Sequence, residues 1–140
     1  MDWKLELVLV PVSDVDRAKT FYTERAGFHL DLDHRAGEHC RVVQLTPPGS
    51  ACSISIGKGI TKAAPGSVEG LHLVVSDIVA ARAELAERGV DVSEVRHLES
   101  GAWVPGPNPE RRDYESFAGF RDPDGNSWVL QEVRRSEPGA

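Results

Sequence analysis

The chain has 140 residues, of which 16 are basic and 22 acidic, so its formal net charge at pH 7 is −6. Nonspecific nucleic-acid binding and docking on anionic membranes both rest on concentrated positive charge, so we expect neither nucleic acid nor membrane as a partner. No apolar run approaches the roughly 20 residues of a membrane-spanning helix, and the first residues lack a signal-peptide pattern, which predicts a cytoplasmic protein.

The first half is predicted to begin with a strand and a helix. Leu5–Val10 is apolar at both parities, which indicates a strand covered on both faces. Ser13 is predicted to cap the following helix, which has acidic side chains in its first turn and ends at Gly27. An apolar stripe follows helical spacing along it: Val15, Ala18, Phe21 and Tyr22.

Three further strands complete the first half, with a turn at Pro47–Ser50 between the last two. They are predicted at Phe28–Asp33, Arg41–Thr46 and Ala51–Ile56. A hairpin about this turn places Cys40 and Cys52 several residue pairs apart, too far for disulfide geometry, so both are expected to be free thiols. The predicted order is β-α-β-β-β.

Lys58–Val68, rich in Gly, Ala and Pro, is predicted as a linker to a second half that repeats this order. Its strands and helix are predicted at Leu71–Val75, Asp77–Arg88, Val90–Val95, Glu115–Arg121 and Ser127–Val133. Trp103–Pro109, with three prolines in seven residues, is predicted as an irregular loop. Asp122-Pro123-Asp124-Gly125 is typical of a hairpin turn, because proline restricts φ and glycine accepts positive φ. In this hairpin Phe120 is predicted to lie opposite Trp128 as a core pair.

The two halves share sequence as well as order. The segment Val12–Ala18 (V-S-D-V-D-R-A) recurs 63 positions later as Val75–Ala81 (V-S-D-I-V-A-A). In each copy an apolar run precedes the segment, and the predicted helix ends at a glycine, Gly27 or Gly89. A duplicated strand–helix unit predicts two similar halves packed around a hollow.

The paired β-α-β-β-β order, the Val-Ser-Asp helix starts and the segment Phe120–Asn126 (F-R-D-P-D-G-N) resemble the vicinal oxygen chelate superfamily. That superfamily includes glyoxalase I, extradiol dioxygenases, fosfomycin-resistance enzymes and bleomycin-binding proteins. The resemblance implies an α+β fold in which the curled mixed sheets of two modules form half-barrels around a shared cavity. It further implies one domain, residues 1–140, with module 1 at about 4–57, the linker at 58–68 and module 2 at about 69–133.

Metal-dependent members of this superfamily hold a divalent ion with His, Gln or Glu from the first and last strands of each module. The corresponding residues here are poor ligands: Leu7, Ser55, Gly70 and Val129. A two-residue shift of the alignment keeps the same sheet face and offers only His72 and Gln131, which falls short of a three- or four-ligand set. We therefore expect no metal at the family's usual site and no cofactor.

Strand alternation predicts which side chains line the cavity. The predicted ligand-binding residues are Leu7, Gln44, Ser55, His72, Trp103, Phe117, Val129 and Gln131. An apolar lining with a few polar groups is typical of small-molecule sites. His72, the candidate catalytic residue, is either a hydrogen-bonded cavity residue or a proton-transfer group. Trp103 and Tyr114 form either a lid over a flat ligand or ordinary packing at the cavity mouth.

An apolar cavity without ligating residues favours a metal-independent protein of the bleomycin-resistance type, which holds an apolar or aromatic compound for sequestration or resistance. The alternative is a metal-independent isomerase or lyase acting on a small carbonyl compound, with His72 as the base. A metal-dependent glyoxalase or dioxygenase is least favoured, because none of the four ligand positions holds a good metal ligand. The resemblance also implies a homodimer, and leaves open whether modules are exchanged and which ligand is bound.

Overall fold

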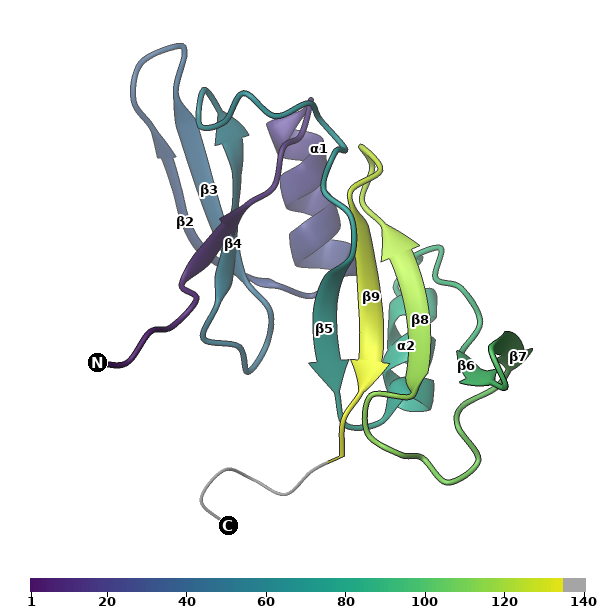
Figure 1. Cartoon of the computed structure of the whole chain (residues 1–140). Coiled ribbons are helices and arrows are strands. Elements are labelled where there is room, and N and C mark those ends of the chain that lie inside the picture. Colours follow the sequence, from purple (N-terminus) through teal and green to yellow (C-terminus); the bar gives the residue numbers. More distant parts are fainter. Residues whose placement is uncertain (135–140) are drawn as a thin grey trace. The chain divides into compact units, whose positions relative to one another are not determined.

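The computed structural model describes residues 1–134; the last six residues of the domain predicted at 1–140 lie outside the described residues. The chain divides into two compact units, and Figure 1 shows the elements of each. The N-terminal unit comprises residues 1–68 with the turn 122–126, and the C-terminal unit comprises residues 69–121 and 127–134. Among the described residues, no helix combines the length and the apolarity needed to cross a bilayer.

The N-terminal unit contains an open four-stranded mixed sheet in the order β1-β4-β3-β2. Its strands are β1 (Leu7–Leu9), β2 (His29–Arg35), β3 (Arg41–Thr46) and β4 (Ser53–Lys58). β1 runs parallel to β4, and the other pairs are antiparallel. The helix α1 (Val15–Thr20) continues into a π-helical turn, η1 (Phe21–Arg25), and contacts β4. The core under this helix consists of Ala18, Tyr22, Val43, Leu45, Ile54 and Ile56.

The C-terminal unit contains an open five-stranded sheet in the order β5-β9-β8-β6-β7. Its elements are β5 (Leu71–Val75), α2 (Ile78–Glu87), β6 (Arg96–Glu99), β7 (Ala102–Pro105), β8 (Ser116–Arg121) and β9 (Ser127–Glu132). The helix α2 contacts β8 and β9. The predicted core pair is confirmed: Phe120 lies opposite Trp128, with ring centroids 6.1 Å apart and planes 2° from parallel.

The α+β fold of two mixed sheets agrees with the sequence-based prediction. The two halves also begin their helices with the same hydrogen bond. The N-caps Asp14 and Asp77 are 63 residues apart, and each accepts a hydrogen bond from the backbone amide three residues later, that of Arg17 or Ala80. The prediction that Ser13 caps the first helix is wrong, because its hydroxyl instead donates to Asp124 Oδ1 at 2.5 Å. The prediction of free thiols is confirmed for Cys40 and Cys52.

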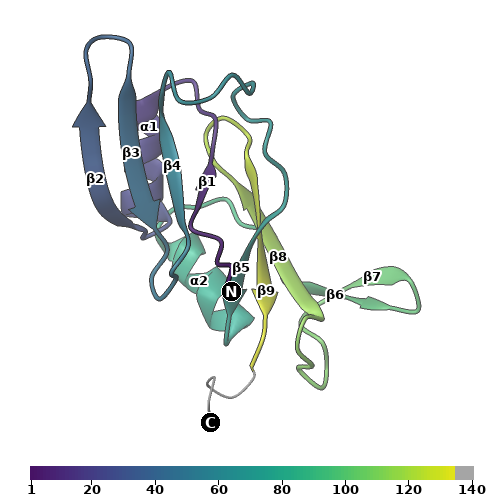
Figure 2. The ribbon, with the colours of Figure 1, turned by 60° about the vertical axis from the view of Figure 1, so that its left-hand side comes forward.

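Two predictions for the second half are wrong. Val90–Val95 is not a strand: its valines are buried in an irregular segment, so burial rather than strand pairing explains their apolar character. The strand follows at β6, which pairs with both β7 and β8. Trp103 lies in β7 and not in a loop, because β6 and β7 form a hairpin that places Trp103 opposite Leu98. Figure 2 shows this hairpin extending from β8.

The turn 122–126 packs within the N-terminal unit. Tyr22 Oη donates to Asp122 Oδ2 at 2.8 Å, and Asn126 Nδ2 donates to the Pro11 carbonyl at 2.8 Å. Gly66 approaches the turn so closely that a Cβ atom at this position would lie 2.1 Å from the Asp124 carbonyl oxygen, and its φ is +80°. This contact therefore requires glycine at position 66.

Candidate functional site

Each sheet has one face packed on its helix and one face without a helix, and the predicted site residues divide between the two uncovered faces. Strand registers place Leu7, Gln44 and Ser55 together on the uncovered face of the N-terminal sheet. The uncovered face of the C-terminal sheet carries the others: His72, Trp103, Phe117, Val129 and Gln131. We call these two surfaces the leucine face and the aromatic face.

The aromatic face contains a contiguous set of apolar and polar side chains. Val129 lies between His72 on β5 and Gly119 on β8, and Gln131 lies opposite Phe117. Phe117 is also paired with Arg96 on β6, which extends the face toward the β6–β7 hairpin. Because directly paired residues point to the same side of a sheet, these side chains form one surface.

Trp103 is the most exposed aromatic side chain of this face, with 48% of its surface accessible. Its ring meets the Phe117 ring nearly perpendicularly, with centroids 5.6 Å apart and planes at 89°. The Arg96 guanidinium carbon lies 4.2 Å from the Trp103 ring centroid, within the range of a cation–π contact. These contacts orient the indole while leaving half of it open, so a planar compound can stack on it.

His72 is exposed on the aromatic face and is held by one hydrogen bond. Its Nδ1 lies 2.7 Å from the Gly70 carbonyl oxygen. A carbonyl only accepts hydrogen bonds, so Nδ1 carries the proton and, in the neutral ring, Nε2 has the free lone pair. His72 therefore presents an acceptor that can bind a ligand donor or take a proton.

The loop between β7 and β8 orients Gln131, whose Nε2 donates to the Tyr114 carbonyl at 3.2 Å. Arg111 and Tyr114 in this loop have φ values of 53° and 70°, which non-glycine residues rarely adopt. The fully buried Glu132 stabilises them: it accepts from Arg111 Nε at 2.8 Å and Nη2 at 2.6 Å, and its carbonyl accepts from the Tyr114 amide at 2.8 Å. The guanidinium lowers the pKa of the Glu132 carboxyl.

The leucine face is mainly aliphatic and hydroxylic, and its strands β1–β4 contain no Phe, Tyr or Trp. Leu7, Leu9 and Leu32 are 36%, 41% and 43% exposed. Ser55 lies opposite Gln44 and is almost fully buried, so it contributes little surface for a ligand.

A β-bulge between Leu30 and Leu32 directs Asp31 onto the leucine face. The Asp31 carboxylate accepts hydrogen bonds from Thr46 Oγ1 and, at 3.4 Å, from Gln44 Nε2, while His29 Nδ1 lies 2.9 Å from its second oxygen. The Thr46 hydroxyl, followed by His29, lowers the pKa of Asp31. This side chain is therefore an anion at neutral pH.

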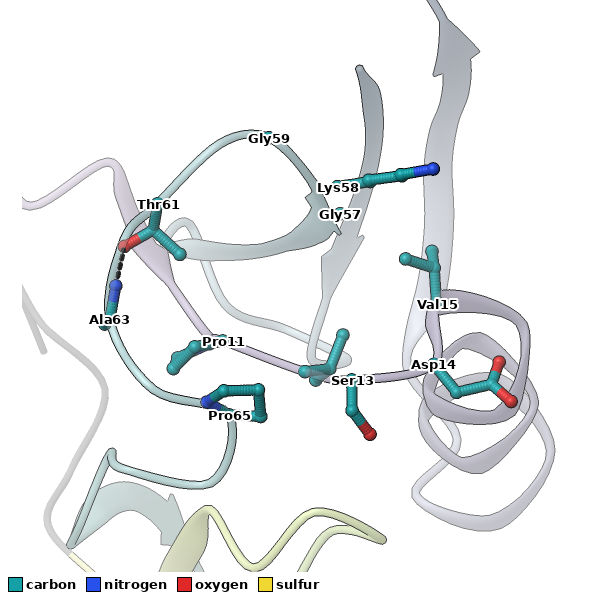
Figure 3. Close-up of a pocket in the computed structure, with 11 residues that line it drawn as sticks. Pro11, Ser13, Asp14, Val15, Gly57, Lys58, Gly59, Thr61, Ala63 and Pro65 are labelled. Carbon is teal, nitrogen blue, oxygen red and sulfur yellow. Dashed lines mark hydrogen bonds between the residues drawn. The ribbon is translucent and has the colours of Figure 1, made fainter. Parts of the chain in front are cut away.

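A pocket of about 550 Å³ lies elsewhere in the N-terminal unit, at the start of α1, and Figure 3 shows its lining. Its polar groups are largely engaged: Thr61 Oγ1 accepts from the Ala63 amide at 3.1 Å, and Asp14 caps α1. Pro11 and Pro65 supply apolar surface. Because none of the predicted site residues lines this pocket, we do not place the function there.

A model of the glyoxalase/bleomycin resistance protein/dioxygenase superfamily matches residues 4–130. The chain belongs to this superfamily. It is similar to TnmS3, an antibiotic binding protein from Streptomyces sp. CB03234, with 36% identity, a TM-score of 0.72 and coverage of 94% of this chain and 96% of TnmS3.

Two further relatives have lower identity. A superfamily member from Sphaerobacter thermophilus DSM 20745 is 27% identical, with a TM-score of 0.71 and coverage of 94% of this chain and 98% of that one. The uncharacterized protein YetH of Bacillus subtilis (strain 168) is 25% identical over 126 residues, which are 89% of this chain and 94% of YetH. The superfamily assignment agrees with the resemblance found in the sequence.

Metal-dependent members of the superfamily place ligands on the first and last strands of each half, and the residues here do not fit an ion. In the structure, Leu9 pairs with Ser55, and His72 pairs with Val129. Of the residues at the four expected positions, only Ser55 has a side-chain lone pair, and a neutral hydroxyl is a weak ligand. Residues 1–134 contain no group of three or more His, Cys, Asp or Glu side chains arranged to share an ion.

Sequence reasoning missed Arg96 and Asp31. Arg96 is the first residue of a short strand with little apolar alternation, so only its pairing with Phe117 reveals that it lies on the aromatic face. In a regular strand, Asp31 would point to the same face as Asp33, which faces the helix. Only the bulge between Leu30 and Leu32 shows that Asp31 lies on the leucine face. A correct prediction of the bounds of β6 would have been enough to place Arg96 on the aromatic face.

Proposed function

We propose that the protein binds a small, flat, apolar or aromatic compound without a metal ion, with the aromatic face as the principal contact surface. The observation that carries this proposal is the half-exposed Trp103 indole, held by Phe117 and Arg96 on a sheet face without a helix. Similarity to TnmS3, an antibiotic binding protein, supports it, and drug sequestration or resistance is the biological role that we propose.

The proposed contacts on the aromatic face divide into two kinds. Trp103, Phe117 and Val129 supply apolar area, and an aromatic stacking contact contributes about 0.5–1.5 kcal/mol beyond that area. His72 and Gln131 supply hydrogen bonds that orient the compound. From the leucine face, we propose Leu7, Gln44 and Ser55 as further ligand contacts, of which Ser55 contributes least because it is buried.

Tryptophan fluorescence and isothermal titration calorimetry with a panel of polycyclic aromatic compounds test this proposal. Trp103→Ala is expected to weaken binding at least about tenfold, the effect of losing one stacked aromatic surface. Trp3→Ala is the matched control, because Trp3 is 87% exposed and precedes β1. The proposal is contradicted if no compound binds the wild type or if the two substitutions have equal effects.

The second candidate function is a metal-independent isomerase or lyase on a small carbonyl compound, favoured by the lone pair that the Gly70 contact leaves on His72 Nε2. In this mechanism, Nε2 removes a proton next to the carbonyl, and Gln131 Nε2 hydrogen-bonds the oxygen that gains charge. His72→Ala would abolish turnover and spare ligand binding. Equal loss of both would assign His72 to binding alone.

We also propose that the protein is a homodimer. Exposed large apolar side chains support this, because a second copy would remove them from water: Leu5, Leu9 and Leu32. Analytical ultracentrifugation at micromolar concentration measures the mass directly. A single species of about 15 kDa, the mass of one chain, would refute the dimer.

A further inference from the structure

The aromatic face is positively charged in a chain whose net charge is −6. Register places twelve strand residues on this face: His72, Val74, Arg96, Leu98, Trp103, Pro105, Phe117, Gly119, Arg121, Ser127, Val129 and Gln131. Two are arginines, one is a histidine, and none of these residues is Asp or Glu. A surface of one sign attracts ligands of the opposite charge.

Arg96 is the basic residue placed to act on a ligand that contacts Trp103. Its guanidinium lies over the indole, 4.2 Å from the centroid, and it forms no ion pair with any residue in the described part of the chain. Arg41 and Arg111 are in contrast bound to carboxylates. A guanidinium that stacks through its flat side keeps its N–H donors around its edge.

We propose that Arg96 determines ligand charge, and that the compound bound on the aromatic face is a flat aromatic acid with a carboxylate or an acidic phenolate. The guanidinium fork can donate two parallel hydrogen bonds to a carboxylate, while the ring attached to that group stacks against Trp103. This inference rests on the proposed function and adds the chemical class of the ligand.

Anthracene-2-carboxylate and anthracene-2-carboxamide test the inference, because they share ring system and shape and differ in charge. Calorimetry at pH 7.5 and low ionic strength is expected to show about fivefold tighter binding of the carboxylate to the wild type, as for one exposed charge pair. Raising the salt concentration to about 0.5 M should reduce this ratio, since salt screens exposed charges.

Two variants separate a local contact from a general effect of charge. In Arg96→Gln the ratio of the two affinities should fall to about one, and in Arg96→Lys it should fall only in part because the charge remains. Arg88→Gln removes the same charge at the C-cap of α2, the helix that covers the opposite face of the sheet, and should keep the wild-type ratio.

The outcomes distinguish this inference from the proposal on which it rests. Equal binding of the two probes to the wild type overturns the role of Arg96 and leaves a neutral aromatic ligand in place. A carboxylate preference that survives Arg96→Gln, or that disappears in Arg88→Gln, also overturns it. Failure of both probes to bind contradicts the proposed function, and the inference falls with it.

Discussion

The two sheets follow one repeated pattern, and they keep the same chemical character, apolar and buried, only on their helix-covered faces. On the helix-covered faces, Ile54 and Ile56 of β4 correspond to Trp128 and Leu130 of β9, and all four are buried. On the uncovered faces, Ser55 corresponds to Val129, and Leu9 to His72. The buried face is constrained by packing, because a change of even one methylene alters core stability. The uncovered face is free to change its chemistry without disturbing the fold.

This divergence produces surfaces of opposite character. The leucine face has aliphatic side chains, hydroxyl groups and the anion Asp31, whereas the aromatic face has Trp103, Phe117 and the cation Arg96. A single backbone arrangement therefore presents two kinds of recognition surface. Each unit has an arginine–carboxylate pair with one buried partner, Arg41 with Asp33 and Glu132 with Arg111, and these pairs allow the comparison to be tested.

The largest expected change in the free energy of unfolding comes from breaking one of two arginine–carboxylate pairs, Arg111–Glu132 or Arg41–Asp33. Glu132→Ala is expected to lower the free energy of unfolding by about 3–5 kcal/mol, because it leaves Arg111 and the Ile78 amide without their buried acceptor. Arg41→Met should cost about 1–2 kcal/mol, since Asp33 keeps its contact with Lys19 and Asp16 is already 77% exposed to water. Urea unfolding followed by circular dichroism measures both, and a larger loss for Arg41→Met would reverse the comparison.

An effect of intermediate size is the pH dependence of the free energy of unfolding that His97 causes. His97, buried in β6, has Nδ1 2.7 Å from the Gly106 carbonyl oxygen and Nε2 3.0 Å from Glu99 Oε2. The carbonyl, followed by the carboxylate, raises the pKa of His97. A raised folded-state pKa contributes stability below the unfolded value of about 6.5, and this contribution is lost as pH rises through the folded value.

Urea midpoints between pH 6 and 8.5 test this effect. The wild type should lose stability over that interval, and His97→Gln should show a flatter profile. The opposite sign holds for Asp33, whose pKa Arg41 and Lys19 hold far below its usual range, so its contribution is lost only in strong acid. A wild-type profile that rises with pH across neutrality would be incompatible with this assignment for His97.

The smallest expected effect concerns Asp31. Asp31→Asn should change the free energy of unfolding by less than about 1 kcal/mol, because the side chain is 25% exposed and the amide keeps an oxygen for Thr46. The ratio of carboxylate to carboxamide affinity should change less than about twofold, since Arg96 on the aromatic face is proposed to select the charge of the ligand. A change as large as that of Arg96→Gln would show that both faces determine ligand charge.

The strands whose pairing follows a clear alternation were predicted closely. Arg41–Thr46 and Leu71–Val75 were located to the residue, and the Asp122–Gly125 turn and the Phe120–Trp128 pair follow from local sequence. β6 and β7 were misassigned, because Arg96–Glu99 has no apolar alternation and the prolines after Trp103 suggested a loop. The buried valines between α2 and β6 carried the apolar signal instead.

The sequence by itself determined the duplicated architecture, the side of each sheet on which most residues lie and the poor metal-binding chemistry of Leu7, Ser55, Gly70 and Val129. These features depend on local periodicity and residue chemistry. Only the tertiary structure decided three other features. The Ser13 hydroxyl hydrogen-bonds Asp124 instead of capping α1, a bulge places Asp31 on the leucine face, and Arg96 stacks on Trp103. Each of these joins residues through strand register or a distant contact, and hydrophobic periodicity carries no information about either.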